Sequence, residues 1–220
     1  MKYPNIKNVA AASHLPAAGE THGNGFKKNL QDKDWTNINS FLVDEDYAEN
    51  MEVALIAGKF FTAEHGKSNS NFVVINEEAL KVLHYNTPMD AIGEEIIYQA
   101  DSSRKAIIGV VKDYNHSQLF STIAPLALMF DQDQVRLLQV RYTGSHEDAI
   151  KTVEKAWRFV HPNLKVDHRH IEAEIKLFYS TIFGDVVNIL GVIALLAIMI
   201  SCLGLLGMAT YTIETRMKES

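Results

Sequence analysis

Histidines and carboxylates are the side chains of this sequence best suited to chemistry, and two histidines are notable for their spacing. His168 and His170 alternate along residues 164–170, LKVDHRH. Alternate side chains of a strand point to the same face, so both imidazoles could ligate one metal ion. The neighbouring sequence offers no third ligand. A solvated strand face therefore explains the pair better than a metal site does.

Carboxylates are closely spaced at two places, where they could supply paired carboxylates for acid–base chemistry. The residues concerned are Asp44, Glu45, Asp46 and Glu49, followed later by Asp131 and Asp133. A solvated helix start and a polar loop explain them better. The sequence contains neither a GxSxG motif nor a GxxxxGK[ST] phosphate loop. We therefore predict a non-enzymatic chain without catalytic, cofactor-binding or metal residues.

Composition separates the end of the chain from the rest. The 220 residues carry a formal net charge of −6, and no run of Lys or Arg is longer than two. This balance argues against nucleic acid as a partner. Cys202 is the only cysteine, which excludes an intrachain disulfide. Apolar residues are concentrated in the last fifth, so residues 1–170 are predicted to form a polar globular unit.

A long apolar segment lies near the end of the chain. Residues 186–213, VVNILGVIALLAIMISCLGLLGMATYTI, contain no charged side chain over 28 positions. A helix needs about 20 apolar residues to cross the hydrocarbon core of a bilayer. A buried helix of a soluble domain would be shorter and would have a polar face. The segment therefore predicts a transmembrane helix in contact with lipid.

Small residues recur every three or four positions within this segment: Gly191, Ala194, Ala197, Ser201, Gly204 and Gly207. In lipid, small side chains allow another helix to approach closely, because association depends on packing. Small residues are also common in membrane helices that make no such contact. We favour a helix-packing face.

Positive charges flank the apolar segment on both sides. Arg216 and Lys218 follow it, whereas Arg169 and Lys176 lie within twenty residues before it. The positive-inside rule therefore comes close to a tie, and charge alone does not determine the topology.

Alternating apolar residues and turn residues predict short elements before residue 135. In chain order we expect a buried strand at 8–16, a glycine-rich turn at 17–25, a strand and then a short helix at 38–51, a strand at 71–76 followed by a helix capped by Asn76, and a β-hairpin formed by 94–99 and 105–111.

A β-α-β order follows residue 135. Strands are expected at 136–142 and 164–170, with a helix between them that is capped by Ser145. We predict an α+β domain of two lobes with mixed sheets and packed helices, in which the lobe at about 58–130 is inserted into the other. The strand near Val9 is the nearest pairing partner for the strand after Val135. A helix from about Glu172 to Tyr211 then continues into the membrane.

Several segments resemble the periplasmic core of MacB-like ABC transporter permeases. They are LIAGKFFTAEHG, FVVINEEALKVL, DAIGEEI and IIGVVKDYNHSQLFSTIAPLALMF. The segment from Ile189 to Glu219, with its CLGLLG centre and ETRMKE exit, resembles the second transmembrane helix of the FtsX-like permease domain. The combination is most similar to versions found in Bacteroidetes-type bacteria.

The resemblance implies a permease subunit in a bacterial inner membrane. Residues 1–183 would be periplasmic, residues 186–213 would be the transmembrane helix, and residues 214–220 would form the cytoplasmic exit, with Arg216 and Lys218 as anchors. Such permeases pair as dimers and bind a separate ATPase. They couple ATP hydrolysis to movement of the periplasmic domain, for efflux or extraction, and some meet periplasmic or outer-membrane partners.

A second function class stays open. In a membrane-anchored extracytoplasmic sensor or binding module, residues 1–170 would recognise a ligand and the helix would serve as a tether. The small-residue face and the uninterrupted helix favour the permease. Neither hypothesis identifies a substrate, and the contact with an ATPase is not contained in the sequence up to Ser220.

Overall fold

The computed structural model describes residues 3–16, 22–117 and 122–218. The chain divides into two compact units, Met1–Arg169 and His170–Ser220. The first unit contains β1 (Ile6–Ala12), β2 (Gly23–Lys27), β3 (Thr36–Val43), α1 (Tyr47–Asn50), β4 (Leu55–Gly58), the 3₁₀ segment η1 (Ala63–Asn71), β5 (Phe72–Asn76), α2 (Glu77–Val82), α3 (Pro88–Ala91), β6 (Glu95–Tyr98), β7 (Arg104–Val111), β8 (Leu126–Phe130), β9 (Leu137–Tyr142) and α4 (His146–Val160). The second unit contains α5 (Ile171–Lys218).

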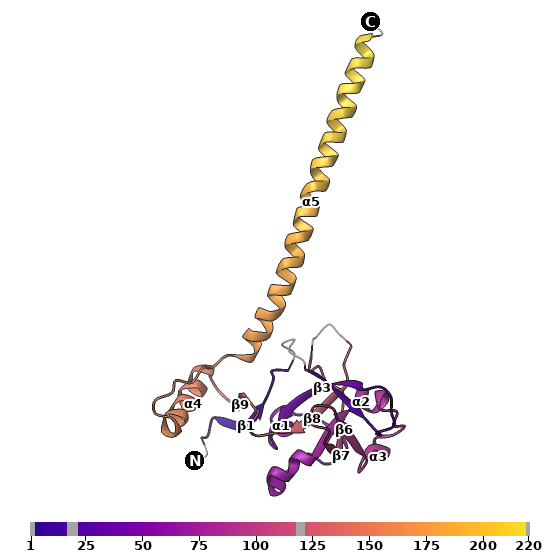
Figure 1. Ribbon diagram of the computed structural model, residues 1–220. Coiled ribbons are helices and arrows are strands. Elements are labelled where there is room, and N and C mark those ends of the chain that lie inside the picture. Colours follow the sequence, from indigo (N-terminus) through magenta and orange to yellow (C-terminus); the bar gives the residue numbers. More distant parts are fainter. Residues whose placement is uncertain (1–2, 17–21, 118–121, 219–220) are drawn as a thin grey trace. The chain divides into compact units, whose positions relative to one another are not determined.

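Within the described residues, one mixed sheet of nine strands organises the first unit (Figure 1). The strands pair in the order β2-β6-β7-β5-β8-β3-β1-β9, β4 pairs with β7, and β2 also pairs with β3. The β2–β3 pairing closes a ring of six strands, namely β2, β6, β7, β5, β8 and β3. The β3–β8 and β5–β7 pairs are parallel, and the other pairs are antiparallel. The predicted α+β class with mixed strands is therefore confirmed.

The sheet separates two hydrophobic clusters, because successive side chains of a strand point to opposite faces. In β5, Val73 and Ile75 belong to one cluster, and Val74 belongs to the other. Short helices α2 and α3 cover the first cluster with Ala79, Leu80, Leu83 and Ala91. The second cluster contains the aromatic side chains of Phe41, Tyr47, Phe61 and Phe130. Each face of the central strands is therefore buried.

Strand β1 pairs antiparallel with β9, from Ile6 opposite Tyr142 to Ala12 opposite Leu137. The predicted pairing of the strand near Val9 with the strand after Val135 is thus confirmed. Strands β2 and β3, which precede the predicted inserted lobe, share the closed ring with β5 to β8. The division into two lobes is not confirmed by this arrangement.

Two helix starts follow the sequence prediction. Asn76 is the N-cap of α2, where its side chain accepts a hydrogen bond from the backbone N–H of Ala79. Ser145 is the N-cap of α4, where its hydroxyl accepts from the N–H of Asp148. The predicted hairpin is also confirmed, since β6 and β7 pair antiparallel. Local side-chain chemistry was sufficient to predict these features.

Two predicted elements are wrong. The segment 164–170 is not a strand, because it pairs with none of the described strands and an extended segment without a partner gains no ladder hydrogen bonds. Residues Gly23–Lys27 form strand β2, so the end of the predicted turn at 17–25 is wrong, whereas residues 17–21 of that turn lie outside the described residues. A Cβ at Gly23 would collide with the side chain of Asn37, and one at Gly25 would collide with that of Gln99. These glycines therefore make room for neighbouring side chains.

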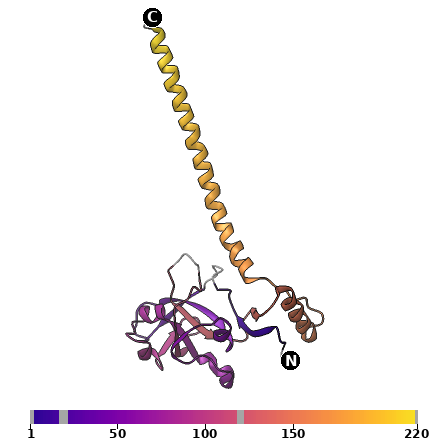
Figure 2. The same ribbon diagram turned by 180° about the vertical axis from the view of Figure 1, so that it is seen from behind.

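Helix α5 is one uninterrupted helix of 48 residues, Ile171–Lys218 (Figures 1 and 2). The predicted continuity from about Glu172 to Tyr211 is confirmed. Gly184 lies inside the helix, and no atom outside the helix backbone comes near the place of its missing Cβ. The glycine costs roughly 1 kcal/mol of helix propensity relative to alanine, which the long helix on either side tolerates.

Candidate functional site

Helix α5 carries the most extensive candidate site. In the described part of the chain, one helix is long and apolar enough to cross a membrane, over Ile171–Ile213, with a mean hydropathy of 2.9 in its most apolar window. None of that window is buried within the protein. The 28 uncharged residues rise about 42 Å, against a hydrocarbon core of about 30 Å. This helix can therefore span a bilayer with some tilt.

The predicted packing residues wind around α5. At about 100° per residue, Ala194, Ala197, Ser201 and Gly204 fall within a sector of about 80°. Gly191 and Gly207 lie about 60° beyond it on opposite sides. No atom lies near the missing Cβ positions of Gly191, Gly204 and Gly207, apart from the helix itself. The central four residues thus form a narrow, open strip, and its use for packing stays a prediction.

Three hydroxyl groups of the apolar segment, those of Ser201, Thr210 and Thr212, bond within the helix. The Ser201 hydroxyl donates to the carbonyl oxygen of Ala197 at 2.9 Å. Thr210 donates to the carbonyls of Leu206 and Gly207, and Thr212 donates to that of Met208. The hydroxyl protons of these serine and threonine residues therefore have acceptors without water, which lowers the cost of placing them in lipid. Arg216 and Lys218 continue the helix backbone, and their side chains lie outside the described residues.

The histidine pair is not brought into a metal site. Among the described residues, no group of three His, Cys, Asp or Glu side chains is placed to hold a metal ion. His168 is exposed on the segment that is not a strand, so the shared strand face on which the metal hypothesis depended does not form.

The first acidic set makes structural contacts. Asp44 Oδ2 accepts a hydrogen bond from the N–H of Ala11 at 2.6 Å and so links β1 to the end of β3. Burial is the main cause that raises the pKa of Asp44, and the charges of Asp46 and Glu45 raise it further. Asp46 is the N-cap residue of α1. The interpretation as a solvated helix start therefore needs correction at Asp44, which is half-buried.

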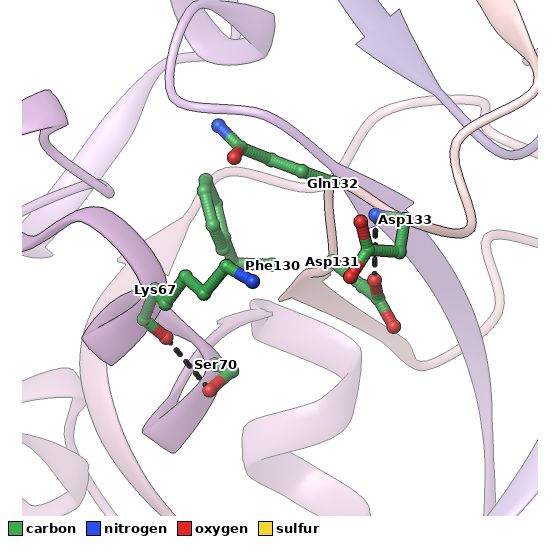
Figure 3. Close-up of a pocket in the computed structure, with 6 residues that line it drawn as sticks. All are labelled: Lys67, Ser70, Phe130, Asp131, Gln132 and Asp133. Carbon is green, nitrogen blue, oxygen red and sulfur yellow. Dashed lines mark hydrogen bonds between the residues drawn. The ribbon is translucent and has the colours of Figure 1, made fainter.

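The second acidic set lines a surface pocket of about 240 Å³ (Figure 3). Its lining consists of Lys67, Ser70, Phe130, Asp131, Gln132 and Asp133. Asp131 accepts hydrogen bonds from the N–H of Asp133 at 2.9 Å and from the amide of Gln134 at 2.7 Å. The Ser70 hydroxyl donates to the Lys67 carbonyl at 2.8 Å. These contacts shape two loops, and the lining places no nucleophile beside a base.

A buried lysine lies next to this pocket. Lys105 is 8% exposed, and its Nζ donates to the carbonyl oxygen of Ser70 at 2.8 Å. Burial lowers the pKa of Lys105, and the charges of Asp101 and Asp131 act in the opposite direction. The ammonium thus fixes the end of η1 against β7.

A polar cluster that the sequence did not predict surrounds Asn76, which is fully buried. Its Oδ1 accepts from the N–H groups of Ala79 and Leu126, at 3.0 and 2.8 Å. Its Nδ2 donates to Asp113 Oδ1 at 2.8 Å and to the Ala124 carbonyl at 3.0 Å. Every donor and acceptor of the amide is used. The cluster joins the start of α2 to the loop after β7 and the start of β8.

Glu77 and Asp113 complete this cluster. Glu77 Oε2 accepts from the N–H of Asp113 at 3.0 Å, and Asp113 Oδ1 accepts from the N–H of Glu78 at 3.1 Å. Burial raises the pKa of Asp113, although the bond from Glu78 acts against it. Only the cap was visible in the sequence, because Asp113 lies 37 residues away. These contacts therefore have a structural role: they connect the start of α2 to the loop after β7.

His116 and two tyrosines form another buried polar group. His116 is 1% exposed, with Nδ1 3.2 Å from the Tyr114 carbonyl and Nε2 3.5 Å from Asn39 Nδ2. A carbonyl can only accept, so Nδ1 carries the proton of the neutral ring and Nε2 accepts from Asn39. Burial lowers the pKa of His116. The Tyr47 and Tyr114 hydroxyls lie 3.3 Å apart, and burial raises the pKa of Tyr47 to about 12.

The fold and the helix together define a class of protein, namely a mixed α+β domain followed by a helix of membrane-spanning length. A family model described as the MacB-like periplasmic core domain matches residues 2–157, which is most of the chain. The chain therefore belongs to this family, the periplasmic domain of MacB-like ABC transporter permeases. No curated protein matches the chain at a significant level.

Two solved structures have a similar fold. The periplasmic region of MacB from Actinobacillus actinomycetemcomitans matches with a TM-score of 0.55 and 14% identity, over 81% of this chain and 78% of that one. The extracellular domain of the noncanonic ABC-type transporter YknZ from Gram-positive bacteria matches with a TM-score of 0.51 and 13% identity, over 74% of this chain and 80% of that one. At these identities the likeness concerns the fold alone.

Proposed function

We propose that this chain is the outer domain and one membrane helix of a permease subunit, and that a separate ATPase drives movement of the domain for efflux or extraction of a substrate. The observation that carries this proposal is the continuity of α5 in a member of the MacB-like family. An unbroken helix is stiff over its whole length, so displacement at one end can be passed to the other. The family consists of transporter components that are generally not catalytic.

The proposed arrangement places residues 1–183 in the periplasm, with the lobe at about 58–130 inserted into the other lobe. Residues 186–213 cross the bacterial inner membrane, and residues 214–220 form the cytoplasmic exit. Arg216 and Lys218 are the proposed anchors at that exit, because cytoplasmic ends of membrane helices are enriched in Lys and Arg. The lack of charge over 186–213 supports the position of the span.

The proposed partners are a separate ATPase, a second permease subunit and membrane lipid, with periplasmic or outer-membrane proteins as further partners. We assign the second permease subunit, or a neighbouring helix, to the strip formed by Ala194, Ala197, Ser201 and Gly204. Open space over the glycines of α5 supports close approach there. Replacing Ala197 by Phe should block this approach, whereas Met199→Phe on the opposite side should not. Crosslinking yield between subunits in the membrane measures the difference.

The test of mechanical coupling uses a helix break. Proline at position 182 removes a backbone hydrogen bond of α5 and costs about 3 kcal/mol, whereas Ile182→Ala keeps the helix. Both variants are introduced into the full-length permease with its ATPase, in vesicles. Fluorophores on a cysteine in place of exposed Glu94 of both subunits report the distance between the two outer domains.

We expect ATP to change this distance in the parent and in Ile182→Ala, and to leave it unchanged in Ile182→Pro while ATP hydrolysis continues. An equal, ATP-driven change in Ile182→Pro would show that α5 is only a tether. A distance that never responds to ATP but responds to a periplasmic ligand would favour the sensor or binding module.

A further inference from the structure

The carboxyl-terminal end of α4 exposes large apolar side chains. Phe159, Val160 and Leu164 are 87%, 67% and 58% exposed. Lys151, Lys155 and Arg158 recur every three or four residues and so share one side of the helix, and Phe159 borders that side. We call residues 151–165 the α4 tip. An aromatic ring on the charged, solvent-facing side of a helix is not required for the core of the domain.

The α4 tip is positively charged in an acidic chain. The tip, residues 151–165, holds four Lys or Arg and one carboxylate, a formal net charge of +3, whereas the whole chain has −6. Glu154 lies 3.7 Å from Arg158, and Asp167 lies 3.6 Å from Arg169. Lys151, Lys155 and Lys165 are exposed and make no ion pair among the described residues. The tip therefore has cations available for an external anion.

The cations also frame a hollow. Lys151, Glu154, Lys155 and Arg158 line a surface pocket of about 200 Å³. Arg158 in the last turn could be explained by attraction to the helix dipole, which falls off within one turn. That explanation does not reach Lys151 and Lys155, which lie further from the end. An anionic headgroup in the hollow would contact the basic side chains of α4 at once.

The tip has a defined shape. The indole Nε1 of Trp157 donates to the carbonyl oxygen of Leu164 at 3.1 Å, and the rings of Trp157 and His161 lie 4.7 Å apart. These contacts hold the turn after α4 back against the helix. The exposed side chains of Phe159 and Val160, at the end of α4, and of Leu164, in the turn after it, therefore have an ordered backbone.

The chain keeps the tip within reach of the proposed membrane. Eleven residues from Val160 to Ile171 span at most about 40 Å, whatever path the linker takes. The uncharged segment begins at Val186, only about 22 Å along α5 from its start. Basic residues that border apolar and aromatic side chains are typical of helices that lie at the surface of anionic bilayers.

We propose that the α4 tip binds the surface of the membrane that α5 crosses, with Lys151, Lys155 and Arg158 on anionic lipid headgroups and Phe159, Val160 and Leu164 in the interface. The inference rests on the proposed crossing of α5. Each cation near an anionic surface contributes about a fivefold factor to binding, so the loss of three should weaken contact on the order of a hundredfold, and their reversal should weaken it further. The contact would hold the outer domain close to the bilayer until it is displaced.

The test uses the full chain with Cys202→Ala and an environment-sensitive fluorophore on Phe159→Cys. The chain is reconstituted in phosphatidylcholine vesicles with and without phosphatidylglycerol, and spin-labelled lipid serves as the quencher. A label on Glu94→Cys is the control for position. The triple variant Lys151→Glu, Lys155→Glu, Arg158→Glu is compared with Lys33→Glu, Lys67→Glu, Lys112→Glu, which changes the charge equally on exposed residues elsewhere.

We expect a blue shift and strong quenching at position 159 only with phosphatidylglycerol, lost in the first triple variant and kept in the second. Equal fluorescence in both lipids, or no quenching in either, would overturn the proposal. A blue shift that depends on protein concentration in lipid-free detergent would identify a second copy as the occupant and also overturn it. Resistance of α5 to alkaline extraction from the same vesicles separates failure of this contact from failure of the membrane crossing.

Discussion

In the folded unit, Phe41, Ile75 and Leu128 are fully buried, whereas Leu196, Ile198 and Leu203 of α5 are each more than half exposed. The first group contacts other side chains of the same unit in its two clusters. The second group belongs to neither cluster. The folded unit therefore buries its apolar side chains in its own core, and α5 requires an external partner to cover its own.

The free energy of burying the apolar side chains of α5 indicates what that partner must be. Burial of one Leu, Ile or Val side chain is worth about 1.5–3 kcal/mol, and α5 exposes such residues over five turns or more. The sum exceeds the 5–15 kcal/mol that stabilises a typical domain. Exposure to water on that scale would drive aggregation. A bilayer surrounds a helix on all sides, which fits apolar side chains distributed around the whole circumference.

The largest expected effect tests whether the two regions bury side chains differently. Phe41→Ala should lower the free energy of unfolding of the folded unit by about 3–5 kcal/mol, because it leaves a cavity between the rings of His14 and His116. Leu196→Ala should leave that free energy unchanged. Urea unfolding in detergent measures both, and a similar loss for Leu196→Ala would contradict the contrast.

A charge in the span should have the next largest effect. Ile198→Lys should cost about 2.5–3.5 kcal/mol for membrane insertion, because the ammonium would lie near the bilayer centre. Leu30→Lys, at a residue of the folded unit that is 72% exposed, should cost nothing measurable. The inserted fraction after alkaline extraction provides the measurement. Unchanged insertion of Ile198→Lys would mean that lipid does not surround this part of α5.

Substitution in the Asn76 cluster of the folded unit should have a smaller effect, on the free energy of unfolding. Asn76→Ala should destabilise the unit by about 2–3 kcal/mol, since it leaves the N–H groups of Ala79 and Leu126 without their acceptor. Asn163→Ala, at an exposed position, should stay within about 0.5 kcal/mol. If chemical denaturation gave equal free energies of unfolding for the two variants, the hydrogen bonds of the Asn76 cluster would not stabilise the unit.

The smallest effect concerns pH. The pKa of His116 is lowered in the folded unit, so the unfolded chain binds more protons between that value and the ordinary 6.5. Its contribution to stability is complete above about pH 6.5 and is lost as pH falls below it. His116→Gln should reduce the slope of stability against pH in this range, with no counterpart in α5. An unchanged slope would show that His116 titrates normally.

The sequence predicted what depends on neighbours along the chain. The cap at Asn76, the β6–β7 hairpin and the length of α5 follow from local spacing. It did not predict the partnership of Asn76 with Asp113 or the strand at Gly23–Lys27. Both depend on which distant side chains meet. Glycine at 23 and 25 indicated a turn, but its physical role is to leave room for Asn37 and Gln99.

The predicted sites also depended on contacts between distant residues, which local sequence does not show. His168 and His170 matched a metal pattern only if 164–170 formed a strand, and a strand forms only where another strand can pair with it. The carboxylate of Asp44 seemed to belong to a solvated helix start, yet it bonds to Ala11, 33 residues earlier. The small-residue strip of α5 needed no tertiary information, because its geometry follows from the helix alone.

Cys202 provides the most direct test of the claim that α5 lies in lipid. This single cysteine is exposed on the surface of α5, near the middle of the uncharged segment. A water-soluble maleimide is excluded from hydrocarbon, so a thiol that lies there should not be labelled. In native membranes of cells that express the unmodified full-length protein, we predict no labelling of Cys202 until the membrane is dissolved in denaturing detergent, after which labelling should be complete. Rapid labelling in intact or merely opened membranes would place the thiol in water and contradict the account.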